Sequence, residues 1–272
     1  MKFFSGLFLL LITTWGHAAT IDTVDVYSPC MKRSFKCVVI TPFVAGQKPV
    51  PVPVVYLLHG FDGSYSNWVS RVPDLGSCAD QYQVMIVCPD AGNSWYFDSP
   101  VDPAFRFETY ISKEVPAYID SNYLTIPRRT ARAITGLSMG GHGALFLAFR
   151  HSETFGACGS MSGGVDLQYT RNKYELAKRI GDTLRHADNW RNYSVMGVIE
   201  RKPADSLAVI LDCGINDFFL PANRGLHQKM LRLNIAHDYI ERPGQHSWTY
   251  WGNAVEFQLL FFHRYFRSQQ LK

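Results

Sequence analysis

The sequence predicts a single α/β domain in which helices cover both faces of a mostly parallel sheet. Apolar segments of strand length recur along the chain, and helix-forming segments separate the later ones. A serine also lies in a glycine-rich turn between one such strand and a helix. The 272 residues, 47% of them hydrophobic and 18% charged, suffice for one large core, and no repeat or low-complexity linker divides the chain.

Eight strands are expected. The first two resemble a hairpin and predict an antiparallel edge, whereas the later ones alternate with helices and predict parallel pairing. The expected ranges are Thr23–Tyr27, Phe35–Thr41, Val54–Leu58, Val84–Cys88, Arg132–Gly136, Ala157–Met161, Leu207–Cys213 and His237–Glu241. The alternation stops at about residues 165–203, where we expect a small helical cap over the serine. Trp190 and Tyr193 in this cap either contact substrate or pack the cap itself.

Residues 1–18 have the three parts of a signal peptide, namely Lys2, an apolar stretch and a small-residue end. We therefore expect a mature domain of residues 19–272 that is periplasmic or secreted and keeps no membrane anchor. Removing the leader takes away one lysine and no acid, so the formal charge changes from +4 to +3. This mild excess of positive charge predicts no nucleic-acid partner.

The six cysteines of an exported protein can form disulfides. Three of them lie in apolar strand segments and are expected to be buried thiols: Cys88, Cys158 and Cys213. Among the others, Cys30 with Cys37, or either with Cys78, are the favoured pairs. No zinc-binding spacing occurs in the sequence, so neither a metal nor another cofactor is expected.

The segment around Ser138 predicts a nucleophile elbow, because an apolar strand precedes the serine and a helix follows it. The tight turn needs neighbours that are nearly free of side chains, which Gly136, Gly140 and Gly141 provide. Ser138 would stand exposed above the end of the sheet. The N–H of Met139, at the start of the helix, would stabilise an oxyanion formed when the serine attacks an ester.

A serine nucleophile needs a histidine base and an acid that orients the histidine. The seventh expected strand runs into a turn that carries Asp217, and the eighth leads into the loop that carries His246. The order serine, acid, histidine on strand-end loops predicts the catalytic triad Ser138, Asp217 and His246. Asp212 is a second candidate acid, but it lies inside the apolar strand, where a structural carboxylate is expected.

The loop after the third expected strand, His59-Gly60-Phe61, predicts the second oxyanion donor. Gly60 lets the backbone turn inward, so that the N–H of Phe61 joins that of Met139, and His59 braces the loop. Trp95 and Tyr96 follow the fourth strand at the sheet edge where ligands bind in open α/β sheets, and they are candidate substrate-binding residues.

Together these motifs resemble a family of esterases that includes esterase D (S-formylglutathione hydrolase), tributyrin-type acetylesterases, acetyl xylan and feruloyl esterases, and the mycolyltransferases. The resemblance spans most of the mature chain and rests on Leu57-Leu-His-Gly60 with Gly63 and Trp68, on Gly136–Ala144, on Asp212–Leu220 and on His246-Ser-Trp248. It implies an α/β-hydrolase fold, and substrate-contacting aromatics at Trp95 and Tyr96. Since esterase D proteins are cytosolic, the leader favours the exported esterases.

The expected function is that of an exported serine carboxylesterase acting on short acyl or feruloyl esters, with a small molecule or a carbohydrate as the alcohol. Three alternatives stay open: acyl transfer to a sugar hydroxyl, thioesterase activity like that of S-formylglutathione hydrolase, and a binding module on a catalytically silent fold. The intact triad argues against the last of these.

Overall fold

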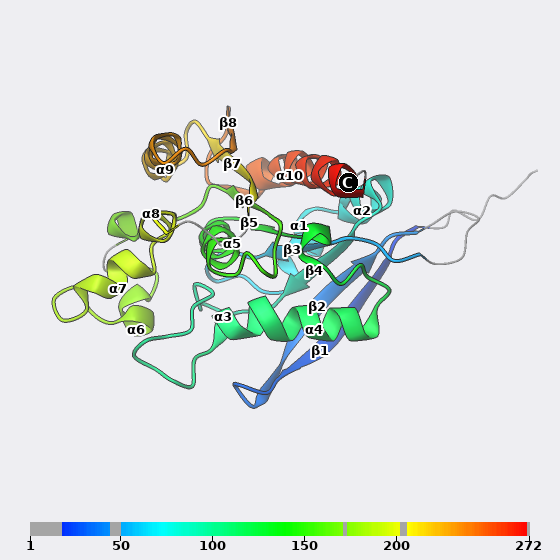
Figure 1. Ribbon diagram of the computed structural model, residues 1–272, viewed down its shortest axis with the longest axis horizontal. Helices are drawn as coiled ribbons and strands as arrows, with labels where there is room; N and C mark the ends of the chain where they lie inside the picture. The colour runs from blue at the N-terminus through cyan, green and yellow to red at the C-terminus, as the bar shows by residue number, and fades with distance from the viewer. Residues whose placement is uncertain (1–17, 44–49, 171–172, 202–205, 271–272) are drawn as a thin grey trace, which may run out of the picture.

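The computed structural model of the chain describes residues 18–43, 50–170, 173–201 and 206–270. An eight-stranded sheet crosses the molecule in the order β1-β2-β4-β3-β5-β6-β7-β8 (Figure 1). Its strands are β1 (Thr20–Ser28), β2 (Arg33–Thr41), β3 (Val54–Leu58), β4 (Met85–Pro89), β5 (Arg132–Gly136), β6 (Ala157–Met161), β7 (Ala208–Gly214) and β8 (Asp238–Arg242). All eight predicted strands are confirmed, to within three residues at each end.

The pairing of the strands also agrees with the prediction. Strand β1 pairs antiparallel with β2, and β2 pairs antiparallel with β4. The other neighbours in the sheet pair parallel. Every residue of β3 and β4 is buried, as expected for parallel strands that are covered on both faces.

Helices cover both faces of the sheet (Figure 1). One apolar layer is built by α1 (Asn67–Arg71), α2 (Leu75–Tyr82) and α10 (Trp248–Gln270). The opposite layer contains α3 (Phe107–Thr109), the π-helix η1 (Tyr110–Glu114), α4 (Val115–Asn122), α5 (Met139–Arg150) and α9 (Leu220–Arg232). A 3₁₀ turn, η2 (Arg129–Ala131), leads into β5. Because the strands from β3 to β8 run parallel, their C-terminal ends lie at one edge of the sheet, where the loops that follow them meet.

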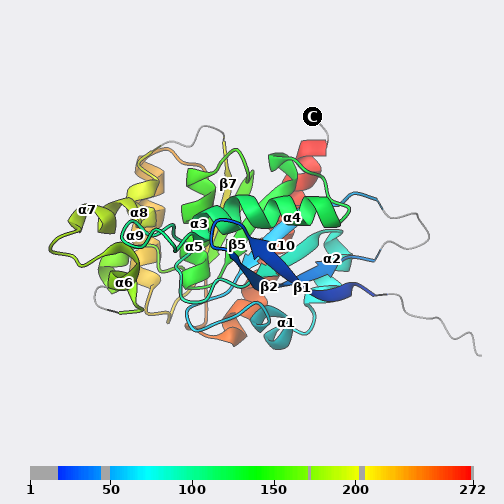
Figure 2. The same cartoon turned by 90° about the horizontal axis from the view of Figure 1, so that it is seen from below.

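The expected cap is present between β6 and β7. It consists of η3 (Leu167–Thr170), α6 (Leu176–Ile180), α7 (Ala187–Asn192) and α8 (Val195–Val198). These segments gather at one end of the molecule, away from the β1–β2 hairpin (Figure 2). Trp190 donates from Nε1 to Gly181 O at 3.0 Å, and Tyr193 donates from its hydroxyl to Asp98 O at 3.1 Å. Of the two open interpretations, these contacts favour packing of the cap.

The predicted signal peptide lies outside the described residues, apart from Ala18. Within the described ranges, no helix has the length and apolar character needed to cross a membrane. All six cysteines are free thiols, so the expected disulfides are wrong. Cys37 points into the apolar layer on one face of the sheet, Cys78 belongs to the layer on the other face, and Cys30 lies exposed in the β1–β2 turn. The strand cysteines are buried, as predicted.

Candidate active site

Ser138 occupies a strained turn between β5 and α5. Its φ of 54° and ψ of −115° lie outside the regions that side chains normally allow. The turn is held by the Ser138 N–H, which donates to Met161 O at 2.9 Å. A Cβ atom at Gly140 would lie 2.5 Å from His59 O, so only glycine permits this approach of helix and loop. The backbone thus has the strand–turn–helix geometry expected of a nucleophile elbow.

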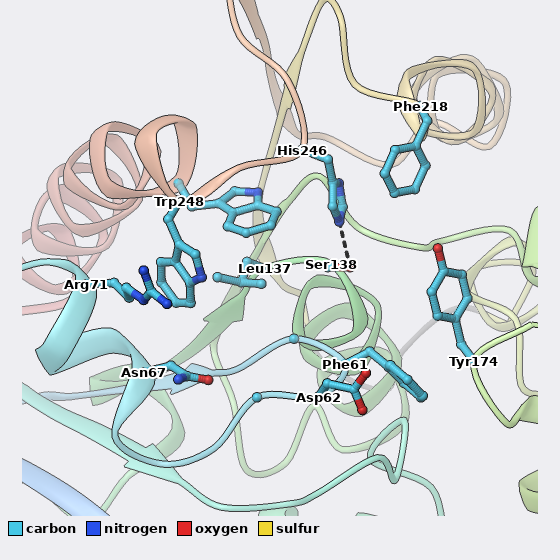
Figure 3. Close-up of a pocket in the computed structure, with 13 residues that line it drawn as sticks. Phe61, Asp62, Asn67, Arg71, Leu137, Ser138, Tyr174, Phe218, His246 and Trp248 are labelled. Carbon is cyan, nitrogen blue, oxygen red and sulfur yellow. Dashed lines mark hydrogen bonds between the residues drawn. The ribbon is translucent and has the colours of Figure 1, made fainter.

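Ser138, His246 and Asp217 form one hydrogen-bonded chain, of which Figure 3 shows the bond between His246 and Ser138. His246 Nε2 lies 2.9 Å from Ser138 Oγ, although 108 residues separate the two in sequence. The Nδ1 atom lies 2.8 Å from Asp217 Oδ2 and 3.1 Å from Oδ1. An ionised carboxylate can only accept, so Nδ1–H donates to Asp217 and Nε2 is left to accept from the serine hydroxyl. This is the arrangement needed to deprotonate Ser138.

Hydrogen bonds within the turn that follows β7 orient the carboxylate of Asp217. The Phe219 N–H donates to Asp217 Oδ1 at 2.8 Å, and the Asp217 N–H donates to Gly214 O at 3.0 Å. The ring of His246 is held from the other side by aromatic contacts, 4.3 Å from the Phe218 ring centroid and 4.8 Å from that of Trp251. Both partners of this hydrogen bond are therefore fixed before any substrate binds.

The other candidate acid, Asp212, lies fully buried in β7 and has different partners. It accepts hydrogen bonds from the Tyr250 hydroxyl and from Arg242 Nη2, the latter at 2.6 Å. Burial raises the pKa of this carboxyl, while both partners oppose the rise. Asp212 is therefore a structural carboxylate, as expected, and the carboxylate that contacts His246 is that of Asp217.

The loop after β3 passes directly beside the serine, because a Cβ atom built on Gly60 would lie 3.5 Å from Ser138 Cβ. His59 is buried, and its Nε2 accepts from the Ala91 N–H at 3.0 Å. Its Nδ1 must then carry the proton, which it donates to Gly60 O at 2.8 Å. Burial lowers the pKa of His59, which keeps the ring neutral. His59 therefore braces the loop, as predicted.

This brace orients the next peptide group. The Gly60 carbonyl also accepts from the Gly63 N–H at 3.1 Å, so it is held toward the body of the loop. A trans peptide holds its N–H opposite its C=O, and the Phe61 N–H therefore points away from His59. Phe61 lines the same pocket as Ser138, and Met139 provides the first amide of α5. These positions are consistent with the predicted oxyanion donors.

A pocket of about 410 Å³ opens above Ser138 and His246. Its walls combine aromatic rings with polar side chains. Figure 3 shows Arg71 and Trp248 at one end of the pocket, and Tyr174 and Phe218 at the other. Phe218 is 56% exposed, so this end is open to solvent. No group of three or more His, Cys, Asp or Glu side chains in the described part of the chain is arranged to hold a metal ion.

The structure corrects the expectation that Trp95 and Tyr96 contact substrate. Both side chains are buried in the core, and neither is among the described residues that line the pocket. Trp95 donates from Nε1 to Tyr174 O at 3.0 Å, and the Tyr96 hydroxyl donates to His59 O at 2.8 Å. The loop after β4 turns these side chains inward, with φ values of 55° and 62°. They therefore support pocket residues from behind.

Sequence reasoning missed the side chains that form the pocket walls. Phe218 directly follows Asp217, and Trp248 lies two residues after His246, so their adjacency to the triad loops was an available signal. Arg71 ends the short helix that follows the oxyanion loop. Tyr174 comes from the cap, and nothing in the sequence indicates that it reaches the pocket.

Comparisons with known proteins agree with this geometry. A family model described as "Putative esterase" matches residues 28–262. An acetyl esterase of Caldicellulosiruptor saccharolyticus is 24% identical over 257 residues, which cover 86% of this chain and 95% of that protein. The diacylglycerol acyltransferase/mycolyltransferase Ag85A of Mycobacterium tuberculosis is 25% identical over 270 residues, covering 85% of this chain and 77% of that one.

Among solved structures, a ferulic acid esterase is 29% identical and superposes with a TM-score of 0.76 over 92% of this chain and 100% of its own. The predicted α/β-hydrolase fold, with its mostly parallel sheet, is thereby confirmed. The model match, the fold and the location of the serine turn agree with one another, and the chain therefore belongs to this esterase family.

Proposed function

We propose that the protein is an exported serine carboxylesterase that hydrolyses short acyl or feruloyl esters, with a carbohydrate as the alcohol. The observation that carries the proposal is the hydrogen-bonded chain from Ser138 through His246 to Asp217, located where a pocket of about 410 Å³ meets the strained turn. Export is proposed from the leader pattern of residues 1–18.

The geometry supports a two-step mechanism. His246 Nε2 takes the proton of Ser138 as Oγ attacks the ester carbonyl, and Asp217 stabilises the resulting imidazolium. The amides of Phe61 and Met139 hold the oxyanion of the tetrahedral intermediate. The protonated His246 then donates to the departing alcohol, which leaves an acyl-serine. A water molecule, deprotonated by His246, releases the acid and restores Ser138.

The substrate class is proposed from the pocket walls and from the relatives. The aromatic side chains that line the pocket include Tyr174, Phe218 and Trp248, and they suit a planar acyl group or the face of a sugar ring. The similarity to an acetyl esterase and to a ferulic acid esterase supports the same choice. Short acyl groups are favoured over long ones because the pocket volume is modest.

The test is the hydrolysis of matched acetyl, butyryl, octanoyl and feruloyl esters, including acetylated xylan, by the mature protein and by its Ser138→Ala variant. We expect Ser138→Ala to lower kcat by about 10⁵-fold or more, since the nucleophile is lost. Ser121→Ala, an exposed change on α4, is the matched control and should keep wild-type rates. Equal rates for wild type and Ser138→Ala would refute the proposal.

Acyl transfer is the second candidate function, because the chain is similar over most of its length to a protein named as an acyltransferase. Both candidates share the acyl-serine, and they differ in whether water or a sugar hydroxyl attacks it. Adding a carbohydrate acceptor to the assay separates them, because transfer yields a new ester and hydrolysis yields the free acid. A thioester substrate in the same assay tests for the thioesterase alternative.

A further inference from the structure

The end of the pocket formed by helix α1 carries a positive charge that no part of the described chain neutralises. We infer that the pocket accepts esters that bear a carboxylate, and that Arg71 and Asn67 bind this carboxylate. The inference rests on the proposed esterase function and adds the chemical class of the substrate. In this role Arg71 sets specificity, while the reaction itself proceeds at Ser138.

Arg71 is the arginine among the described residues that line this pocket. Many arginines of this protein are paired with acids, for example Arg242 with Asp212 at 2.6 Å and Arg150 with Glu108 at 2.7 Å. Arg71 lines the pocket, and it makes neither a hydrogen bond nor an ion pair through its side chain with any residue that the structure describes. Its guanidinium donors therefore remain available to a ligand.

A second donor lies one helical turn before Arg71. Asn67 is four residues earlier in α1, so the two side chains lie on the same face of the helix, and both line the pocket. The Oδ1 of Asn67 accepts from the Ser64 N–H at 2.7 Å, which fixes the orientation of the amide. Its Nδ2 donates to no described residue. A guanidinium and an amide nitrogen from one face of the helix offer donors to the two oxygens of a carboxylate.

The remaining charges of the pocket do not offset Arg71. Asp62 is the only carboxylate among the described lining residues, and it already accepts from Asn93 Nδ2 at 2.8 Å. In Figure 3, Asp62 lies beside Phe61, on the other side of Asn67 from Arg71. The α1 end of the pocket therefore favours an anion, because Arg71 is exposed there and no described carboxylate pairs with it.

Trp248 gives this end a rigid wall. Its ring packs edge-on against Trp68, at 5.2 Å between centroids, and against Trp251, at 5.5 Å. Trp68 is itself anchored through Nε1, which donates to Leu58 O at 3.0 Å. A sugar or aryl ring stacked on Trp248 would place a carboxylate substituent near Arg71, while the ester group lies at Ser138. Esters of acidic sugars and of carboxylated acyl groups share this chemistry.

Two pairs of esters test the inference, because the members of each pair differ only by methylation of one carboxylate. The acyl-side pair is 4-nitrophenyl hydrogen succinate and 4-nitrophenyl methyl succinate. The alcohol-side pair is 3-acetoxybenzoate and its methyl ester. The quantity measured is the ratio of kcat/KM for the charged ester to that for the neutral ester. It is compared among wild type, Arg71→Gln and the control Arg232→Gln, an exposed change at the end of α9.

We expect Arg71→Gln to lower this ratio about fivefold in one of the two pairs, which is the effect expected from losing one partly exposed ion pair. The pair of esters that is affected identifies the side of the ester that Arg71 contacts. Arg232→Gln should keep the wild-type ratio. The preference should also shrink as the ionic strength approaches 1 M, where the screening length is about 3 Å. Ratios that are the same in wild type and Arg71→Gln for both pairs would overturn the inference.

Calorimetric titration separates this inference from the proposed function. Binding of the same esters is measured with Ser138→Ala and with the double variant Ser138→Ala/Arg71→Gln, neither of which needs turnover. Tighter binding of a charged ester than of its methyl ester, lost in the double variant, supports the Arg71 site even if wild type hydrolyses nothing. Equal binding of charged and neutral esters by Ser138→Ala overturns the site even if the esterase activity is established.

Discussion

Replacing Asp217 with asparagine should switch the protonation of His246 without changing the shape of the site. The Phe219 N–H donates to Oδ1 of residue 217 at 2.8 Å, so an asparagine must keep its oxygen at that position. Its amide nitrogen then takes the place of Oδ2, which lies 2.8 Å from His246 Nδ1. An amide nitrogen can only donate. Nδ1 must therefore accept, and the proton moves to Nε2, which faces Ser138 Oγ at 2.9 Å.

A histidine in this tautomer cannot accept the serine proton. The loss expected for a wrong tautomer in a serine triad is about 10⁴ in kcat, which corresponds to about 5 kcal/mol of transition-state stabilisation. The fold should change little, because the asparagine keeps the volume of Asp217 and its bond to the loop. KM should also stay near the wild-type value, since no substrate contact is removed.

Asp212→Asn is the matched control. It removes the charge that balances Arg242 inside the sheet, so it should lower the free energy of unfolding by about 3 kcal/mol and leave the kcat of the folded protein much closer to wild type. The assay combines kcat on a short acyl ester with urea unfolding. The reasoning fails if Asp217→Asn keeps kcat within about tenfold of wild type, or if Asp212→Asn is the slower enzyme.

Four further predictions concern two glycines and two buried histidines. Gly140→Ala would place a Cβ atom 2.5 Å from a backbone oxygen and should cost about 3 kcal/mol in urea unfolding. Gly225→Ala, whose Cβ would meet nothing within 4 Å in helix α9, should instead stabilise by about 1 kcal/mol. His142 is buried, which lowers its pKa to about 3, so only the unfolded chain binds a proton between about pH 6.5 and 3. As the pH falls through that window, the free energy of unfolding of wild type should thus decrease by about 1.4 kcal/mol per pH unit relative to that of His142→Leu. Parallel curves of unfolding free energy against pH for the two proteins would contradict this. His59→Gln should lower kcat about tenfold to a hundredfold by releasing the Phe61 amide, whereas a change in KM alone would argue against that role.

The sequence by itself determined the strand order along the chain and the residues of the candidate triad. Parallel strands covered on both faces must be continuously apolar, and the strained turn at Ser138 requires glycine neighbours. Both features are therefore determined by residues that are adjacent in sequence. Asp217 and His246 were found because each follows a strand, and the C-terminal ends of parallel strands meet at one edge of the sheet.

Only the tertiary structure decided what surrounds the triad. Trp95 and Tyr96 follow β4 at the edge of the sheet where ligands were expected, but left-handed backbone angles turn both side chains into the core. The pocket walls instead come from Arg71, Trp248 and Tyr174, which belong to three segments far apart in sequence. No local pattern marks Arg71 or Tyr174, because a pocket is formed by the way separate loops pack against one another, and that packing depends on the whole fold.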